Sequence, residues 1–474
     1  MTIPNKTSQN IYLIGIKGVG MTMLAQFLAA KGNKISGSDI KDVFLTDKVL
    51  RAAKIKIRSP FDEKNIPTGT NLIIHSSAFN SQNNSELAYL KNNPARFKNV
   101  KILSYAEALG EIFNQYYGFA VCGSHGKTTT TAWLGYVLWR AGKKPNVLVG
   151  SRVPQFKGSS LSGRSKYFVA EVDEYQNKFQ YFRPRGVVLN NIDYDHPDFF
   201  KSAAAYTKAF VDFVKKIPRR GFLIINNRDA ESQKIKPYCR GRVISYDLES
   251  GANYMATAIK RRGAYQFFHV QHAKKDLGEF KISLWGEHNI LNALAVIAAA
   301  RELGVSFPAL KKHLAGFTGT ERRAQILGRY HGALIIDDYA HHPTEIQAML
   351  KGLREHYQTK KIITVFHPHT FTRTKAFFKN FVRSFINTDE LIILDIYGSA
   401  REKQGGVSSR QLAAGIIKFN RAHNRRAHKI KPNVQYIATM PAAARYLKKR
   451  LKPNNILLLM GAGDVFRIGE KLLK

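Results

Sequence analysis

Short apolar runs alternate with helical periodicity in the first hundred residues of the chain. Residues 11–15 (IYLIG) form an apolar run that ends in glycine, residues 21–30 have the apolar spacing of an amphipathic helix, and a strand-like pattern resumes at residues 34–36. This order is typical of a βαβ unit with parallel strands. Further strands are predicted at residues 72–75 and 101–103. The pattern therefore predicts a first α/β domain over residues 1–108.

The same alternation begins again twice. An apolar strand at residues 119–122 runs into a glycine-containing loop and then into a helix from residue 128 to about residue 141, and the helical periodicity of residues 287–303 ends at Gly304. Other strands are predicted at residues 167–170, 186–190, 222–225, 334–336, 362–366, 391–395 and 456–460. We therefore expect three successive α/β domains with mainly parallel sheets, the second over residues 109–320 and the third over residues 321–474.

The charge of the chain is strongly positive. Lys and Arg number 74 against 34 Asp and Glu, a formal net charge of +40, and such a surface attracts polyanions. A basic ATPase that acts on nucleic acid is therefore an alternative. However, the sequence has no recognised nucleic-acid motif, and its basic segment at residues 418–431 has few aromatic residues for base stacking. We expect this segment to be a solvated helix end and loop, and we do not expect nucleic acid as a partner.

The sequence contains no candidate membrane anchor. No uninterrupted apolar stretch approaches the roughly 18 residues of a membrane-spanning helix, and residues 1–10 are polar. The two cysteines, Cys122 and Cys239, are too few for a disulfide framework or a structural zinc site. We therefore expect a cytoplasmic protein with no membrane partner. The sequence does not determine its oligomeric state.

The loop at residues 123–129 (GSHGKTT) lies between a predicted strand and a predicted helix. In that setting, backbone N–H groups freed by glycine and a helix N-terminus bind phosphate. Lys127 would reach the terminal phosphates of a nucleotide, and the Thr128 hydroxyl would complete a Mg²⁺ shell. The loop is shorter than the standard GxxxxGK[ST] pattern, because Val121 stands five residues before Gly126. The candidate ATP-binding residues here are Gly123, Ser124, His125, Gly126, Lys127, Thr128 and Thr129.

A second glycine loop follows the first predicted strand. Gly15, Gly18 and Gly20 lead into a helix, and Asp39 ends the next strand, an outline similar to that of a dinucleotide-binding fingerprint. The spacing is GxxGxG instead of GxGxxG, which argues against a nicotinamide oxidoreductase. A structural turn and a phosphate-binding site both stay open for this loop.

Polar residues also gather where later strands end. Residues 171–174 (EVDE) follow one strand and residues 193–196 (DYDH) follow the next. Carboxylates and a histidine beside a phosphate loop suit a divalent cation held with substrate phosphates, and a polar cluster at a sheet edge is the alternative. Residues 337–344 (DDYAHHPT) and 366–373 (FHPHTFTR) repeat the arrangement. At residues 337–344 a metal site and strand-end capping are equally open.

Taken together, these motifs resemble the Mur ligases, and the resemblance covers almost the whole chain. The similar segments are GIKGVGM (15–21), SGSDI (36–40), GSHGKTTTT (123–131), AEVDE (170–174), EHNILNA (287–293), ERRAQILG (321–328), DDYAHHPTEI (337–346), PHTFTRT (368–374), LDIYGSAREK (394–403) and MGAGD (460–464). The resemblance implies a Rossmann-like N-terminal domain for a UDP-sugar acid, a P-loop central ATPase domain and a Rossmann-like C-terminal domain. It also implies an ATP-dependent amide ligase of peptidoglycan synthesis that works through an acyl phosphate, with ATP and Mg²⁺ as cofactors and UDP-N-acetylmuramate and L-alanine as substrates.

The resemblance further implies roles for individual residues in nucleotide binding. Thr128, Glu171 and His196 would hold the metal ion. Asn289 and Asn292, which lie three residues apart on one face of a helix, would contact adenine. Arg323 and Asp338 would contact the nucleotide from the third domain. The implied catalytic residues are Lys127, His196, Asp338 and His342.

Other residues would bind the remaining substrates. His342, His369 and Arg373 would position the amino acid or the carboxylate of the sugar. The residues implied to lie near the UDP-sugar are Gly15, Gly18, Gly20, Ser38, Asp39, Ser76, His369 and Arg373.

Some positions depart from the family pattern. Lys17 stands where the family usually has glycine. It therefore either adds a cation near the diphosphate or forces the backbone into a strained conformation. Thr370 replaces an arginine that usually follows the histidine. Residues 174–176 and 190–191 are more similar to a branch of the family that attaches a whole tripeptide to UDP-N-acetylmuramate. Tripeptide ligation is therefore the alternative activity, while the third domain favours alanine.

Overall fold

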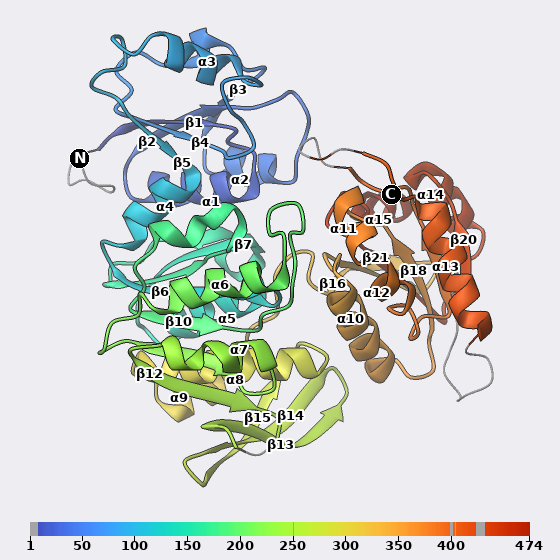
Figure 1. The fold of residues 1–474 in the computed structure, drawn as a ribbon. Coiled ribbons are helices and arrows are strands. Elements are labelled where there is room, and N and C mark those ends of the chain that lie inside the picture. Colours follow the sequence, from blue (N-terminus) through green and yellow to red (C-terminus); the bar gives the residue numbers. More distant parts are fainter. Residues whose placement is uncertain (1–7, 250, 399–401, 403, 423–431) are drawn as a thin grey trace. The chain divides into compact units, whose positions relative to one another are not determined.

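The computed structural model describes residues 8–249, 251–398, 402, 404–422 and 432–474. The first residues of the chain, and parts of the predicted segments 394–403 and 418–431, lie outside the described residues. Figure 1 shows the ribbon of the chain with its labelled elements. The chain divides into two compact units. The first unit comprises residues 1–192, 209–255 and 294–317, and the second comprises residues 193–208, 256–293 and 318–474.

The first unit begins with a five-stranded parallel sheet in the order β3-β2-β1-β4-β5. Its strands are β1 (Asn10–Ile14), β2 (Lys34–Ser38), β3 (Lys56–Arg58), β4 (Leu72–His75) and β5 (Lys101–Ser104). Its helices are α1 (Val19–Ala30), α2 (Thr46–Ala52), α3 (Ser85–Asn92) and α4 (Tyr105–Phe113). Tyr12, Ile14 and Ile73 pack against Leu87 and Leu90 of α3. This packing fixes the strand ends beside the first glycine loop.

The second sheet of the first unit is mainly parallel, with the strand order β12-β11-β10-β6-β9-β7-β8 and only the β7–β8 pair antiparallel within this run. Its strands are β6 (Tyr117–Cys122), β7 (Asn146–Val153), β8 (Gly158–Leu161), β9 (Tyr167–Glu171), β10 (Gly186–Leu189), β11 (Phe222–Asn226) and β12 (Arg242–Asp247). Helix α5 (Lys127–Arg140) follows β6 after the loop at residues 123–126 and is buried along most of its length. The Trp133 indole donates to the Leu314 carbonyl of α9 (Phe307–Leu314) at 3.1 Å.

The division between the units falls within α6 (Ala203–Val214), β13 (Tyr254–Arg262) and α8 (Glu287–Glu302). In the second unit, β14 (Tyr265–His272) and β15 (Lys275–Ile282) form an antiparallel hairpin. The sequence did not predict this hairpin, because its exposed face mixes charged and aromatic residues and its turn at residues 273–274 contains no glycine.

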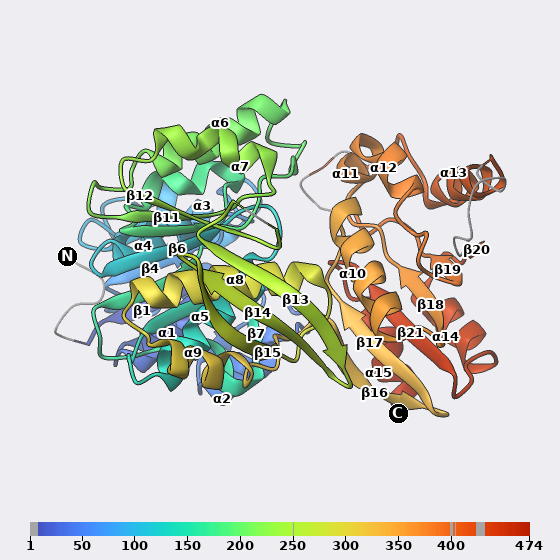
Figure 2. The same ribbon diagram turned by 90° about the horizontal axis from the view of Figure 1, so that it is seen from below.

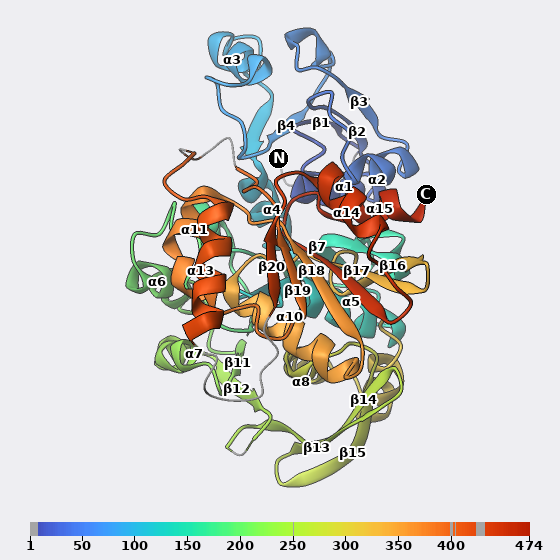
Figure 3. The same cartoon turned by 90° about the vertical axis from the view of Figure 1, so that its right-hand side faces the viewer.

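The third sheet lies wholly in the second unit, in the order β16-β17-β21-β18-β19-β20 (Figures 2 and 3). Its strands are β16 (Gln325–Tyr330), β17 (Ala333–Asp338), β18 (Lys361–Phe366), β19 (Glu390–Ile393), β20 (Asn433–Tyr436) and β21 (Asn455–Met460), and all pairs except β16–β17 are parallel. Helices α10 (Pro343–His356), α12 (Phe378–Val382) and α13 (Ser409–Ala422) cover one face, and α14 (Met440–Lys448) and α15 (Phe466–Leu473) cover the other.

The predicted strands agree with the observed ones to within two residues at each end. In the described part of the chain, no helix has the length and apolar character required to cross a membrane.

Candidate functional site

The phosphate-binding loop connects β6 to α5. Gly123 and Gly126 have positive φ angles of 122° and 78°. Residues other than glycine rarely adopt such backbone conformations. A Cβ atom on Gly123 would also lie 2.7 Å from the Asn191 carbonyl oxygen. The Lys127 ammonium folds back over the loop and donates to the carbonyls of Gly123 and Ser124 at 2.5 and 2.9 Å. The two glycines are therefore required by the loop's shape.

Two of the three implied metal ligands are brought together in the first unit. The Thr128 hydroxyl donates to Oε1 of Glu171 at 2.9 Å, and the Gly150 N–H donates to Oε2 at 2.8 Å. Glu171 ends β9 and Thr128 lies in the first turn of α5, so their oxygens meet at the carboxyl end of the sheet. Hard oxygen donors of this kind fit Mg²⁺.

His196, the third implied ligand, belongs to the second unit. Its φ angle is 55°, in the left-handed region, which histidine, like asparagine and aspartate, adopts more often than most other non-glycine residues. Its N–H donates to Oδ1 of Asp195 at 2.7 Å, and its Nε2 lies 3.9 Å from Oδ2 of the same residue.

The first glycine loop makes a tight turn between β1 and α1. Gly15 has φ of 78°, and a Cβ there would lie 2.8 Å from the Phe79 ring. A Cβ on Gly20 would lie 2.8 Å from the Tyr105 ring, whereas one on Gly18 would make only ordinary contacts. The structure thus gives a steric reason for Gly15 and Gly20.

Lys17 is buried and is held by the loop that follows Asp39. Its N–H donates to Oδ2 of Asp39 at 2.6 Å, while its ammonium donates to the carbonyls of Ile40 and Asp42 at 2.9 and 2.8 Å and lies 3.7 Å from Asp47. Its φ is not positive. Burial raises the pKa of Asp39, although the hydrogen bond from Lys17 opposes this. The lysine therefore ties two loops together and does not strain the backbone.

Ser38 is bound to a buried carboxylate that sequence reasoning missed. Its hydroxyl donates to Oε2 of Glu86 at 2.5 Å, and Oε1 accepts from Tyr12 and Asn65 at 3.2 and 3.1 Å. Burial raises the pKa of Glu86, which is fully inaccessible to solvent. No sequence signal marks Glu86, since it lies in the first turn of an ordinary helix.

Ser76, the other serine implied to lie near the UDP-sugar, makes a local contact. Its hydroxyl oxygen accepts a hydrogen bond from the Ala78 N–H at 3.2 Å.

In the second unit, Arg373 forms a buried, bidentate ion pair with Asp195. Its Nε and Nη2 donate to the two carboxylate oxygens at 3.0 and 3.2 Å, and its Nη1 lies 3.3 Å from Nδ1 of His369. Burial opposes ionisation of Asp195, but Arg373 and His196 hold its pKa well below the usual range. Burial and then Arg373 lower the pKa of His369 to about 4, so this imidazole is neutral at pH 7.

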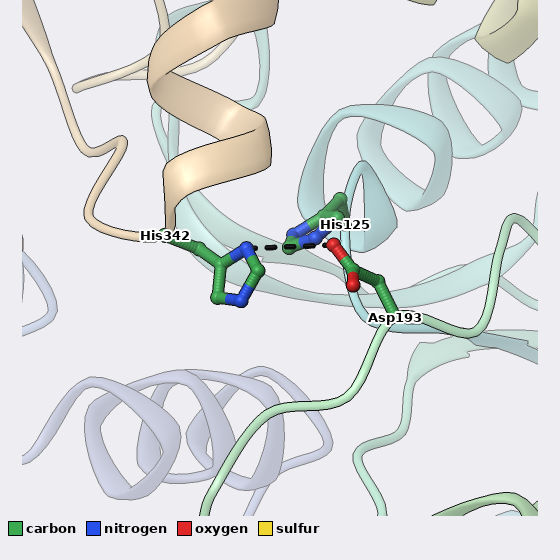
Figure 4. Close-up of side chains that lie close together, drawn as sticks. All are labelled: His125, Asp193 and His342. Atoms are coloured by element: carbon green, nitrogen blue, oxygen red, sulfur yellow. Dashed lines mark ion pairs between the residues drawn. The ribbon is translucent and has the colours of Figure 1, made fainter. Parts of the chain in front are cut away.

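His342 caps helix α10. It forms a reciprocal capping box with Glu345, and Pro343 occupies the first helical turn, a position that suits proline. Its Nδ1 also lies 3.4 Å from the Asp193 carboxylate, which accepts from the Thr344 hydroxyl at 2.6 Å. Figure 4 draws the Asp193–His342 ion pair as a dashed line. The segment 337–344 thus contains the N-terminal cap of α10.

Asp338 and Arg323, the candidate nucleotide-binding residues of the second unit, are held by defined contacts. Both oxygens of Asp338 accept backbone N–H groups, from Ala324 at 2.7 Å and Ala340 at 2.8 Å, and burial raises its pKa against the effect of Arg323. The Arg323 guanidinium lies 3.7 Å from Glu345. These contacts fix Asp338 at the end of β17.

The two asparagines of α8 lie on one face of the helix, as predicted. The Asn292 amide donates to Oδ1 of Asn289 at 3.1 Å, and the Asn289 amide donates to the Trp285 carbonyl at 2.6 Å. Both side chains are buried.

Family models match most of the chain. The Mur ligase family catalytic domain matches residues 10–117, the Mur ligase middle domain matches residues 121–300, and the Mur ligase glutamate ligase domain matches residues 322–463. The predicted resemblance to the Mur ligases is therefore confirmed.

Curated relatives match over the full length. The chain is 37% identical to the UDP-N-acetylmuramate--L-alanine ligase of Desulfitobacterium hafniense, covering 98% of this chain and 99% of that protein. It is 38% identical to the ligase of the same name from Clostridium kluyveri, covering 98% of both chains.

Solved structures share the fold. The UDP-N-acetylmuramate-alanine ligase of Thermotoga maritima superposes with a TM-score of 0.81 at 24% identity, covering 98% of each chain. A murein peptide ligase of Psychrobacter arcticus superposes with a TM-score of 0.72 at 23% identity, also covering 98% of each chain. The predicted three-domain α/β fold with mainly parallel sheets is confirmed by this likeness.

Proposed function

The chain belongs to the Mur ligase family, and from this membership we propose that it joins L-alanine to UDP-N-acetylmuramate with hydrolysis of ATP, a step of peptidoglycan synthesis. The observation that carries the proposal is the full-length match, at 37–38% identity, to relatives named for this reaction. We propose that it acts in the cytoplasm.

The chemistry requires an activated carboxylate, because a free carboxylate is a poor acceptor for an amine. A carboxylate oxygen of UDP-N-acetylmuramate attacks the γ-phosphorus of ATP, the bond to the β-phosphate oxygen breaks, and an acyl phosphate and ADP result. The alanine amine then attacks the acyl carbon, loses a proton, and expels inorganic phosphate as the amide forms. Both steps need neutralisation of the negative charge on the phosphoryl group.

The phosphate-binding loop and a bound metal ion would supply this positive charge. Lys127 and the start of α5 would face the phosphates, where the ammonium and the helix N-terminus both favour anions. Thr128 and Glu171, together with His196, would hold Mg²⁺, which supplies Lewis-acid neutralisation of the transferring phosphoryl group. The meeting of the Thr128 and Glu171 oxygens supports this assignment.

The other candidate residues would bind either the nucleotide or the two remaining substrates. Asn289 and Asn292 would contact adenine through buried amides, and Arg323 and Asp338 would contact the nucleotide. The glycine loop, Ser38, Asp39 and Ser76 would border the UDP moiety. His342, His369 and Arg373 would position the amino acid or the sugar carboxylate. Because Arg373 already pairs with Asp195, a substrate carboxylate would either share this guanidinium or displace Asp195.

Coupled phosphate release tests the proposal. Purified protein should release phosphate from ATP only when UDP-N-acetylmuramate and L-alanine are both present. With the sugar acid and phosphate but without alanine, label should exchange between ADP and ATP through the reversible acyl-phosphate step. ATP consumption stimulated by DNA or RNA, and not by the sugar acid and alanine, would contradict the proposal and favour a nucleic-acid-dependent ATPase.

A further inference from the structure

The short phosphate-binding loop is held from the neighbouring strand by Asn191, which follows β10. The Ser124 N–H donates to the Asn191 carbonyl at 3.0 Å, and the His125 N–H donates to the side-chain oxygen of Asn191 at 2.8 Å. In return, the Asn191 amide donates to the His125 carbonyl at 3.2 Å. Gly123 has no room for a Cβ because the Asn191 backbone lies against it. One residue thus satisfies both polar groups of the His125 backbone.

Asn190 extends this attachment to the helix. Its N–H donates to the Cys122 carbonyl at 3.0 Å, and its buried side-chain amide donates to the Thr130 hydroxyl at 3.0 Å and to the His125 carbonyl at 3.2 Å. The loop is therefore connected to β10 at its beginning, in its middle and at the first turn of α5.

These hydrogen bonds decide which loop groups face a phosphate. The N–H groups of Ser124 and His125 point to Asn191, so they do not point toward a ligand. A helix leaves its first N–H groups without intrahelical acceptors, and in this chain those groups belong to the residues from Gly126 onward. The short loop therefore directs phosphate binding to the start of α5 and to Lys127.

We infer that Asn191 is a positioning residue for ATP: its side chain fixes the shape of the loop that presents the start of α5 and Lys127 to the phosphates. Only an amide side chain of this length supplies both the acceptor for the His125 N–H and the donor for the His125 carbonyl. Aspartate keeps the acceptor but loses the donor and adds negative charge, and alanine loses both. This inference rests on the proposed function, since it assumes that the loop binds ATP.

Steady-state kinetics and calorimetric titration of Mg-ADP test the inference with three variants of the full chain. Asn191→Ala and Asn191→Asp should each raise the KM for ATP and the Kd for Mg-ADP at least tenfold, with the KM for UDP-N-acetylmuramate unchanged within twofold. The control Asn93→Ala removes an asparagine whose side-chain amide caps α3 at 2.9 Å, and it should leave all three constants unchanged. Melting temperatures show that each variant is folded, and Asn191→Ser replaces any variant that is not.

Two outcomes distinguish the inference from the function on which it rests. If Asn191 variants keep the KM for ATP and the Kd for Mg-ADP within twofold of the parent while Lys127→Ala is inactive, the inference is overturned and the proposed function stands. An equal rise in the KM values for ATP and the UDP-sugar would also overturn it, since that pattern indicates general loss of structure. If Lys127→Ala retains full turnover, the assignment of the loop to ATP fails first.

Discussion

The Thr128 hydroxyl donates a 2.9 Å hydrogen bond to the Glu171 carboxylate. The two residues are 43 positions apart in the chain, yet they meet because β9 pairs with β6 and a short loop leads from β6 into α5. The other oxygen of Glu171 is fixed by the Gly150 N–H at 2.8 Å. The carboxylate is thus held in place before any ligand arrives.

Glu171→Gln tests the proposed metal role of this carboxylate. The substitution keeps the shape of the side chain but removes its charge, so the Mg²⁺ concentration for half-maximal activity should rise at least roughly tenfold, the lower limit found for groups that merely support a metal ligand. The measurement is a Mg²⁺ titration of phosphate release. Glu249→Gln, on an exposed side chain, is the control. An unchanged half-saturation would remove Glu171 from the metal site.

Lys127→Ala should abolish ligation without unfolding the protein. The ammonium donates to the carbonyls of Gly123 and Ser124 in its own loop, and its proposed task is to neutralise phosphate charge. We expect turnover to fall by about a hundredfold or more, with an unchanged circular dichroism spectrum. Lys127→Arg should recover little of the turnover, because the planar guanidinium group of arginine does not replace the compact ammonium of lysine. Lys215→Ala, at an exposed lysine, is the control, and near-normal turnover of Lys127→Ala would contradict the assignment.

The Asp195–Arg373 pair should show strong coupling in a double-mutant cycle. Each residue is buried and each serves as the charge partner of the other. Removing one partner of such a pair leaves a buried charge and costs about 3–5 kcal/mol of stability. We expect Arg373→Met and Asp195→Ala each to cost this much in urea unfolding, and the double variant to cost less than their sum. Additive losses would show that the pair does not act as a unit.

Asp337 should make the stability of the third sheet depend on pH. Burial, opposed by Arg322, raises its pKa from 3.8 to about 6. A carboxyl with a raised pKa in the folded state contributes stability below about pH 4, and this contribution is lost as the pH rises through about 6. Between these values, the parent should lose on the order of 3 kcal/mol at most relative to Asp337→Asn. Urea unfolding of both proteins across this range measures the difference, and parallel curves would contradict it.

The positions of the strands were predictable because short apolar runs mark buried parallel strands. The clustering of polar residues was predictable because the carboxyl ends of parallel strands meet at one edge of the sheet. The resemblance to the Mur ligases singled out Thr128 with Glu171 and Asn289 with Asn292. Strand-end logic alone placed only residues 171–174 beside the phosphate loop. It did not predict the β14–β15 hairpin, whose residues face solvent on one side. The sequence left Lys17 open as a cation near the diphosphate or as a source of backbone strain. In the structure its ammonium donates to the carbonyls of Ile40 and Asp42, in the loop after Asp39.

Other features depend on tertiary packing and have no local signature. Glu86 is an ordinary first-turn glutamate in the sequence, yet it receives hydrogen bonds from Ser38, Tyr12 and Asn65. Asp195 and Arg373 are 178 positions apart, so their pairing emerges only from the fold. The bond between Asn191 and the phosphate loop is of the same kind.

The central claim is that the chain ligates alanine, and the most direct test is a competition for the activated sugar acid. The purified protein is incubated with ATP, Mg²⁺, UDP-N-acetylmuramate and equal concentrations of L-alanine, glycine, L-serine and the murein tripeptide, and the products are identified by mass spectrometry at low conversion. The account predicts UDP-N-acetylmuramoyl-L-alanine as the main product. Accumulation of the tripeptide conjugate instead, or of no conjugate at all, would contradict it.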